Sequence, residues 1–266
     1  MDITVSVISH RHGDEVRELL ARLAALGAGR PRRVIVTFNV PEPAIRAEID
    51  GASWPFALAL VDNAQPAGFG ANHNSAFRLD REQGPSALFA VLNPDVHWQG
   101  DPFAAMQPLL AAAPRVGLVY PIQFGADGGR QDQERLVPTL ARLWARHRPG
   151  GRAQELPAGA APDWVNAAFV LLRREAFASV GGFNEGYHMY CEDVDLCLRL
   201  QLAGWRLARA DGAAVVHAAR RASRRDPRHL FWHLSSLWRL WRSRTWQAWR
   251  ARQAGESSYL DSIDHP

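Results

Sequence analysis

The sequence predicts an α/β fold in which helices flank a mostly parallel central sheet. Short apolar or alternating segments rich in β-formers recur along the chain, and segments with apolar residues at helical spacing separate them. Strands that alternate with helices usually pair in parallel. The chain has 266 residues, of which 47% are hydrophobic. This is enough for one globular domain, or at most two, without disulfide staples.

The N-terminal part of the chain supplies most of these elements. Ile3, Val5 and Val7 alternate along a first strand, and apolar residues from Val16 to Leu26 follow at helical spacing. We expect further strands at residues 34–38, 56–61, 87–92 and 116–120, and helices at residues 69–79 and 102–112.

Beyond residue 120 the alternation weakens. Residues 134–147 predict one amphipathic helix, interrupted near Pro138, and the Gly- and Pro-rich residues 149–162 predict a mobile loop. A buried strand at residues 164–172 and helices at residues 173–180 and 194–203 complete the expected domain.

Charge and cysteine content indicate the cellular compartment and limit the possible classes of protein. The sequence contains no Lys, its 31 basic residues are all Arg, and the net charge is +4. No apolar run approaches the roughly 20 residues that cross a bilayer, and the N-terminus lacks a signal-peptide pattern. Cys191 and Cys197 form no CxxC motif, which suits a reducing compartment. We therefore expect a cytoplasmic protein.

Polar residues that directly follow strands are the first candidates for function. In open parallel sheets, ligands bind beyond the carboxyl ends of the strands. Four places qualify, namely Ser9-His10, Asn39, Asp62-Asn63 and Asn93-Pro94-Asp95. The last follows an apolar strand, so Asp95 is a candidate ligand for a hard cation such as Mg²⁺ or Mn²⁺. The alternative is an ordinary turn, because Asn, Pro and Asp favour turns.

Three acids crowd the start of the helix expected at residues 194–203. Glu192, Asp193 and Asp195 exceed what capping a helix N-terminus requires. Adjacent carboxylates raise each other's pKa, which suits a general base that removes a proton from a hydroxyl. Asp195 and Arg199 are four residues apart and predict a structural ion pair.

Three weaker signals remain ambiguous. Gly68 and Gly70 open a helix whose amides could hold phosphate, but the pattern is neither a dinucleotide fingerprint nor a P-loop. His217 follows an apolar run and is either a metal ligand or a hydrogen-bonded partner of another group. His97 would share a strand face with Asp95, but Pro94 indicates that the strand has ended, so we assign it no role.

Several motifs together resemble a known family. They are VSVISH at residues 5–10, GFGANHNSAF at 68–77, LNPDV at 92–96, the long block at 164–207 and VVH at 215–217. In this order they resemble the family 2 glycosyltransferases of the GT-A fold, particularly bacterial rhamnosyltransferase-like members. The resemblance covers about residues 1–218. It implies a domain with a nucleotide-sugar half at about 1–120 and an acceptor half at about 121–218, followed by a basic helix and tail at 219–266.

The resemblance also implies roles for individual residues. It implies an inverting transfer from a nucleotide-sugar donor to a glycan or lipid-linked acceptor in cell-surface polysaccharide synthesis, rhamnose being the first candidate sugar. The implied roles are catalysis by Asp193 with Glu192, binding of Mg²⁺ or Mn²⁺ by Asp95 and His217, donor contacts at Ser9, His10, Asn39, Asn72, Asn74 and Asn93, and acceptor contacts at Trp164, Gly182 and Phe183.

This sequence departs from the family pattern at three places. Asn39 stands where the family commonly has an acid that holds the nucleobase, Asn184 replaces the usual Asp of GGFDE, and an Ala replaces a usual Gly after Trp164. The nucleobase and the acceptor therefore stay open.

The C-terminal segment combines Arg with Trp. Between His217 and Arg252 there are ten Arg and one acid, and five Trp lie between Phe231 and Arg250. Leu230, Leu234, Leu237, Trp238 and Trp241 follow helical spacing. Two interpretations stay open: a helix in an anionic membrane interface at the inner face of the plasma membrane, or a helix that packs on the domain and exposes its Arg to solvent.

Two other classes of function compete with sugar transfer. A nucleotidyltransferase would also place carboxylates and a metal at strand ends. A binding module could use the Arg- and Trp-rich segment on a membrane or a nucleic acid. We expect no nucleic-acid partner, because the sequence contains no helix-turn-helix or RNP pattern.

Overall fold

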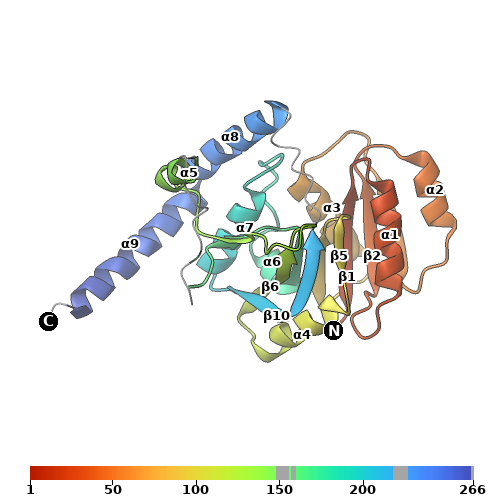
Figure 1. The fold of residues 1–266 in the computed structure, drawn as a ribbon, viewed down its shortest axis with the longest axis horizontal. Helices are drawn as coiled ribbons and strands as arrows, with labels where there is room; N and C mark the ends of the chain where they lie inside the picture. The colour runs from red at the N-terminus through yellow and green to blue at the C-terminus, as the bar shows by residue number, and fades with distance from the viewer. Residues whose placement is uncertain (148–155, 157–159, 218–226, 265–266) are drawn as a thin grey trace.

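The computed structural model describes residues 1–147, 156, 160–217 and 227–264, and within them an eight-stranded mixed sheet carries helices on both faces (Figure 1). The strand order is β3-β2-β1-β4-β9-β6-β10-β5. The first four strands of this order run parallel, as the sequence predicts. They are β1 Ile3–Ser9, β2 Arg33–Phe38, β3 Ala57–Asp62 and β4 Leu88–Leu92, and the helices between them are α1 Gly13–Ala24, α2 Pro43–Gly51 and α3 Phe69–Glu82.

The other half of the sheet mixes directions. Strand β9, Phe169–Arg173, lies antiparallel between β4 and β6, Val116–Phe124. Strand β10, Arg206–His217, runs parallel to β6. The short edge strand β5, Val96–Trp98, pairs antiparallel with the end of β10, and the helix α4, Pro102–Ala112, follows it. Pro94 does end β4, as expected, but the chain then re-enters the sheet at its far edge.

Two predicted elements were wrong in detail. Glu134–Arg135 form strand β7, which pairs with β8 at Trp164–Val165, so the predicted helix begins only at Leu140 and forms α5, Leu140–His147. Pro138 explains the late start, because proline disfavours helical geometry in the residue before it. The predicted strand at 164–172 is likewise split, and the Asn166 side chain accepts a hydrogen bond from the Ala168 amide at 3.2 Å between its two parts.

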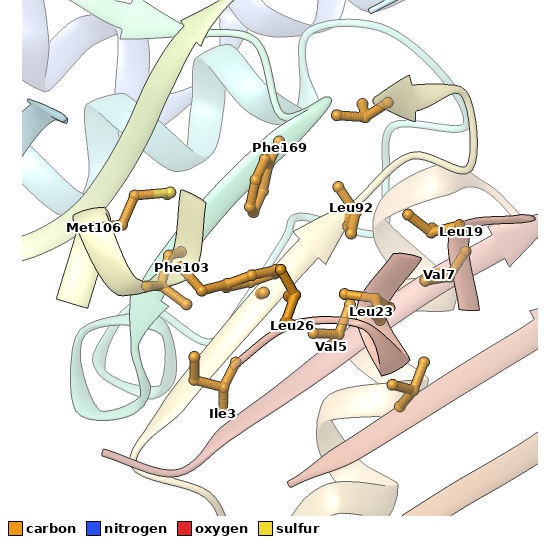
Figure 2. Close-up of a cluster of buried hydrophobic side chains, with 14 of the residues drawn as sticks. Ile3, Val5, Val7, Leu19, Leu23, Leu26, Leu92, Phe103, Met106 and Phe169 are labelled. Atoms are coloured by element: carbon orange, nitrogen blue, oxygen red, sulfur yellow. The ribbon is translucent and has the colours of Figure 1, made fainter. Parts of the chain in front are cut away.

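The core forms on both faces of the sheet because side chains alternate along β1. Ile3, Val5 and Val7 point to one face, where they pack with Leu19 and Leu23 of α1 (Figure 2). Thr4 and Ser6 point to the other face and are fully buried there. Their hydroxyls bond to Asp80 and His73 of α3.

The second face of the sheet is covered by later helices. The helices α6 Arg174–Ser179 and α7 Glu192–Leu202 contribute buried side chains to one cluster, which includes Phe177 and Leu196. Most of the loop predicted at 149–162 lies outside the described residues.

The C-terminal segment forms two helices where the sequence predicted one and a tail. They are α8 Pro227–Arg242 and α9 Arg244–Asp264. Ser243 starts α9, because its hydroxyl accepts a hydrogen bond from the Trp246 amide at 3.0 Å. Trp246 and Trp249 are buried in the domain core, so α9 packs on the domain. Within the described residues, no helix is both long enough and apolar enough to cross a membrane.

Candidate active site

The pairing of β5 with β10 brings Asp95 and His217 together. His217 is the register partner of Val96, the residue after Asp95. Asp95 Oδ1 and His217 Nε2 lie 3.5 Å apart, and both side chains are largely but not fully buried. Burial acts to raise the pKa of Asp95, but His217, a backbone hydrogen bond and His12 together outweigh it, so the pKa is lower than usual. The predicted metal ligands are therefore adjacent.

The strand ends connect Asp95 to the second pair of acids. The backbone N–H of Asn93 donates to the Ala168 carbonyl at 2.8 Å, which fixes the loop before β9 beside the end of β4. The amide of Ala167 in that same loop faces the carboxylate of Asp193. Asp95 and Asp193 therefore both belong to the end of the sheet where β4 ends and β9 begins.

Glu192 and Asp193 occupy the first turn of α7. The two residues before them, Tyr190 and Cys191, adopt left-handed backbone conformations with φ of 72° and 65°. Such conformations are costly for residues other than glycine and are concentrated at functional sites. The turn directs Asp193 toward Ala167 and Arg135, while Glu192 is only 7% exposed.

Both carboxyl groups have raised pKa values. Burial is the main cause for each, and the like charge of Asp193 raises the pKa of Glu192 further. The Val194 amide, which donates to Asp193 Oδ1 at 2.8 Å, and the Arg135 guanidinium offset part of the rise at Asp193. Asp193 is more accessible than Glu192. A half-buried carboxylate with a raised pKa is suited to accept a proton.

A network of amides lies beyond the ends of β2 and β3. Asn63 donates to Asn39 Oδ1 at 2.8 Å and to Asn72 Oδ1 at 2.7 Å. Asn39 also donates to the Ala67 carbonyl and contacts Nδ1 of the exposed His10 at 3.1 Å. The network fixes the chain turn at 63–68 and leaves His10 and Asn63 accessible at its rim.

Two residues predicted to bind the donor form side-chain hydrogen bonds within the protein. The Ser9 hydroxyl donates to Glu42 and accepts from the His12 amide, so it holds the loop after β1. Asn74 donates to the Phe183 carbonyl and to Glu185, and accepts from the Phe183 amide at 2.9 Å. These bonds hold both side chains within the protein, as the amide network does for Asn39 and Asn72, and the donor contacts of Ser9 and Asn74 stay predictions.

Gly182 and Phe183 are likewise buried against α3. A Cβ on Gly182 would lie 2.4 Å from Asn74 Oδ1, and a Cβ on Gly70 would lie 2.6 Å from Phe183. Phe183 is 2% exposed and contacts Phe177 edge-to-face. These contacts support the loop that leads to Glu192, and the acceptor role of Gly182 and Phe183 stays a prediction. The predicted Asp195–Arg199 ion pair is confirmed at 2.6 Å, and Arg199 also donates to the Gly182 carbonyl.

Trp164 lines a groove next to Asp193. Its indole nitrogen donates to the Leu136 carbonyl at 3.0 Å, and the Arg135 guanidinium lies 5.2 Å from its ring centre. The groove is lined by Asp132, Arg135, Leu136, Val137, Pro138, Arg142, Leu143 and Trp164. Because Arg135 also faces Asp193, the groove adjoins the candidate base.

Sequence reasoning did not assign a role to three further residues of the site. His12 lies close enough to Asp95 to lower its pKa. Arg135 faces Asp193, and Asn63 joins the amide network. Asn63 was visible as a polar residue after a strand, but His12 and Arg135 reach the site only through the tertiary fold.

Comparison with known proteins identifies related chains. The family model described as the N-terminal domain of galactosyltransferase matches residues 166–221. The N-acetylglucosaminyl-diphospho-decaprenol L-rhamnosyltransferase of Mycobacterium tuberculosis (strain ATCC 25618 / H37Rv) is 34% identical over 261 residues, which cover 89% of this chain and 82% of the relative. Rhamnosyltransferase WbbL of Escherichia coli (strain K12) is 27% identical over 247 residues, which cover 89% of this chain and 91% of the relative.

Solved structures share the fold at low sequence identity. A structure of GalNAc-T7 with UDP, GalNAc and Mn²⁺ has a TM-score of 0.62 at 10% identity, over 81% of this chain and 43% of that chain. The S. aureus TarS structure has a TM-score of 0.61 at 13% identity, over 82% and 37%. The chain thus spans less than half the length of these two proteins. Mannosyltransferase PcManGT from Pyrobaculum calidifontis, with GDP-Man and Mn²⁺, has a TM-score of 0.54 at 15% identity, over 96% and 75%.

Proposed function

Since the chain belongs to the bacterial rhamnosyltransferase-like glycosyltransferases of the GT-A fold, we propose that it transfers L-rhamnose from a nucleotide-sugar donor to a hydroxyl of a lipid-linked glycan, with inversion at the anomeric carbon. The observation that carries this proposal is that Asp95 and Asp193 belong to the same end of the sheet. It supports one site in which Asp95 binds the metal and Asp193 acts as the base. The names of both relatives support rhamnose, and the name of the Mycobacterium tuberculosis relative supports a diphospholipid acceptor.

The donor set at Asp95 and His217 fits Mg²⁺ or Mn²⁺. One carboxylate oxygen and one imidazole nitrogen lie 3.5 Å apart. Two ligands that each lie about 2.1 Å from one ion are separated by about 3 to 4 Å. Among the described residues, no third His, Cys, Asp or Glu completes a cluster. Donor phosphate and water would supply the other ligands, as hard cations accept. The bound cation would stabilise charge on the diphosphate leaving group, by about 4 kcal/mol per charge pair at 4 Å and an effective dielectric of 20.

Asp193 is proposed as the general base. The acceptor oxygen forms a bond to the anomeric carbon while the bond from that carbon to the diphosphate breaks, and its electron pair leaves with the nucleoside diphosphate. The hydroxyl proton passes to the Asp193 carboxylate. Positioned proton transfer contributes about 10²- to 10⁴-fold to a rate. Burial keeps the pKa of Asp193 high, and the charge of the nearby Arg135 offsets part of that rise.

The remaining roles follow from position. Asn93 at the end of β4 and the network of Asn39, Asn72 and His10 are proposed to hold the donor. The groove at Trp164 is proposed to hold the acceptor next to the base. We place the reaction at the inner face of the plasma membrane, where a lipid-linked acceptor would be presented and where the Arg-rich α8 could meet anionic lipid.

Product analysis tests this function. The protein is incubated with dTDP-rhamnose, Mn²⁺ and an N-acetylglucosaminyl-diphospholipid, and we expect dTDP to appear together with a rhamnosylated lipid. Pyrophosphate release would instead support a nucleotidyltransferase. Donor binding in a thermal-shift assay without any product would support a non-catalytic binding module.

A further inference from the structure

Exposed large apolar side chains gather on two helices. Among the described residues there are eight such side chains, and Met1 and Val216 are the only two that lie elsewhere. The other six are between 58% and 70% exposed and are Leu140 and Trp144 on α5 and Leu230, Phe231, Leu234 and Trp238 on α8. Single exposed apolar residues are ordinary, but a gathered set marks an interaction surface.

The exposed residues of α8 occupy one arc of the helix. Positions 230, 231, 234 and 238 fall within about 100° at 3.6 residues per turn. A different arc, with Ser236, Leu237 and Leu240, is buried against the domain, and the Ser236 hydroxyl donates to the Met189 carbonyl at 2.8 Å. The exposed arc is therefore not the face that docks α8 to its own domain.

Helix α5 repeats this arrangement. Leu140 and Trp144 lie one turn apart and are exposed, whereas Leu143 packs against the core cluster. The Trp241 indole of α8 donates to the Pro138 carbonyl at 2.8 Å, two residues before α5 begins. Figure 1 shows α5 beside the junction of α8 and α9. The two helices that carry the exposed apolar residues are thus neighbours.

The charge of the two helices selects the partner. Helix α5 contains two Arg and α8 contains three, and neither contains an Asp or Glu. The Arg242 guanidinium lies 5.3 Å from the ring centre of the exposed Trp238. Aromatic rings with cationic heads suit the headgroup region of an anionic bilayer, where the rings enter the boundary and the guanidinium groups meet phosphate.

We propose that the six exposed residues of α5 and α8, together with Arg239 and Arg242 of α8, form a surface that docks on an anionic lipid bilayer. The surface would bring a lipid-linked acceptor to the groove, and only this purpose rests on the proposed function. That groove is lined by Arg142 and Leu143 of α5 itself. A membrane that receives α5 therefore lies next to the acceptor groove.

Vesicle sedimentation of the full chain tests the surface. We expect the protein to pellet with phosphatidylcholine vesicles that contain phosphatidylglycerol and to stay in solution with phosphatidylcholine alone. The triple variant Trp144→Ser, Phe231→Ser, Trp238→Ser should bind the anionic vesicles at least tenfold more weakly, because each loses buried apolar area. The single substitution Val216→Ser removes an exposed apolar side chain outside the surface and should leave binding unchanged.

A charge pair of variants isolates the electrostatic part. Arg239→Gln with Arg242→Gln should weaken binding by about tenfold, whereas Arg22→Gln with Arg81→Gln, which removes the same charge from α1 and α3, should not. Equal binding by the wild type and the triple variant would overturn the proposal. So would a dimer in gel filtration that the triple variant abolishes, because the surface would then serve a second copy. Vesicle binding is measured without substrate, so its result does not depend on whether the protein transfers rhamnose.

Discussion

At the scale of single residues, the site separates two neighbouring acids by their exposure. Asp193 is half-buried and faces Arg135, whereas Glu192 is buried and has an unpartnered Oε2 atom. Substitution Asp193→Asn should lower kcat by about 10²- to 10⁴-fold and leave donor affinity unchanged. Asp14→Asn, an exposed acid on α1, is the control. A wild-type kcat in Asp193→Asn, measured by dTDP release, would show that Asp193 is not the general base.

The raised pKa of Asp193 also predicts a pH dependence. A base with a raised pKa stays protonated to higher pH, so kcat/KM should rise with pH through that value. Glu192 has the higher pKa of the pair and is therefore protonated where Asp193 titrates, so Glu192→Gln should leave the acid limb of the profile at the same pH. A clear shift of the acid limb in Glu192→Gln would contradict this order of titration.

The metal assignment predicts a difference between two histidines on paired strands. His217→Ala should raise the Mn²⁺ concentration for half-maximal activity by about tenfold or more, because it removes a ligand. His97→Ala on β5 lies one register position away and is the control. Identical Mn²⁺ titrations of the two variants would contradict the assignment of His217.

At the scale of elements, the glycine pair before α7 sets the loop that carries the acids. Gly181 and Gly182 both have φ of +73°, but an added Cβ meets no atom at Gly181 and meets Asn74 at Gly182. Gly181→Ala should cost about 1 kcal/mol of unfolding free energy from backbone strain alone, and Gly182→Ala about 1 to 3 kcal/mol more. Urea denaturation checks this, and equal losses would show that the contact does not matter.

Local patterns predicted those elements whose residues pack as the pattern indicates. The alternation of Ile3, Val5 and Val7 and the spacing of α1 were sufficient, because each element buries its apolar side in the core. Helix α3 instead buries mainly polar side chains, among them Asn72, His73 and Asp80. Strand β5 has three residues and exists only because the end of β10 pairs with it. The split of α8 from α9 depends on a single cap at Ser243.

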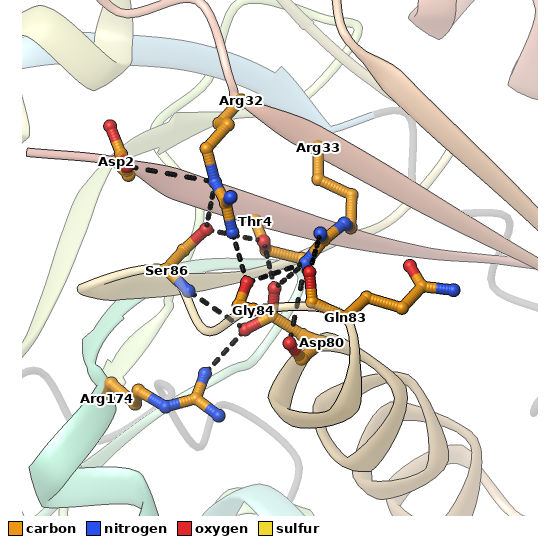
Figure 3. A network of polar contacts seen from close by, with 9 residues as sticks. All are labelled: Asp2, Thr4, Arg32, Arg33, Asp80, Gln83, Gly84, Ser86 and Arg174. Atoms are coloured by element: carbon orange, nitrogen blue, oxygen red, sulfur yellow. Dashed lines mark hydrogen bonds and ion pairs between the residues drawn. The ribbon is translucent and has the colours of Figure 1, made fainter.

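At the scale of the whole molecule, Asp80 joins four elements at the sheet edge opposite the site. It is fully buried and bonds to Arg33 of β2, Arg174 of α6 and Thr4 of β1 (Figure 3). Asp80→Ala leaves two guanidinium groups without their acid and should cost about 3 to 5 kcal/mol in urea denaturation. Asp2→Ala, which removes an exposed ion pair with Arg32, should cost at most about 1 kcal/mol. Similar losses in both variants would contradict the network's role.

The candidate site was predictable in its chemistry and less so in its contacts. Asp95 and His217 were candidates because each follows a strand, and Asp193 because acids crowd the start of a helix, and the resemblance pointed to all three. The inward contacts of Asn74, Gly182 and Phe183 could not be predicted from the sequence, because a residue in a functional motif can face inward to hold the motif together. Which side of a loop a side chain takes is set by packing, which no local pattern records.

A crystal structure with Mn²⁺ and dTDP tests most directly whether two distant acids serve one reaction. We expect an anomalous Mn²⁺ peak in contact with both Asp95 and His217, diphosphate oxygens on the same ion, and the Asp193 carboxylate facing the sugar position from the other side. A Mn²⁺ ion bound without Asp95, or an Asp193 turned away from the diphosphate, would contradict this assignment.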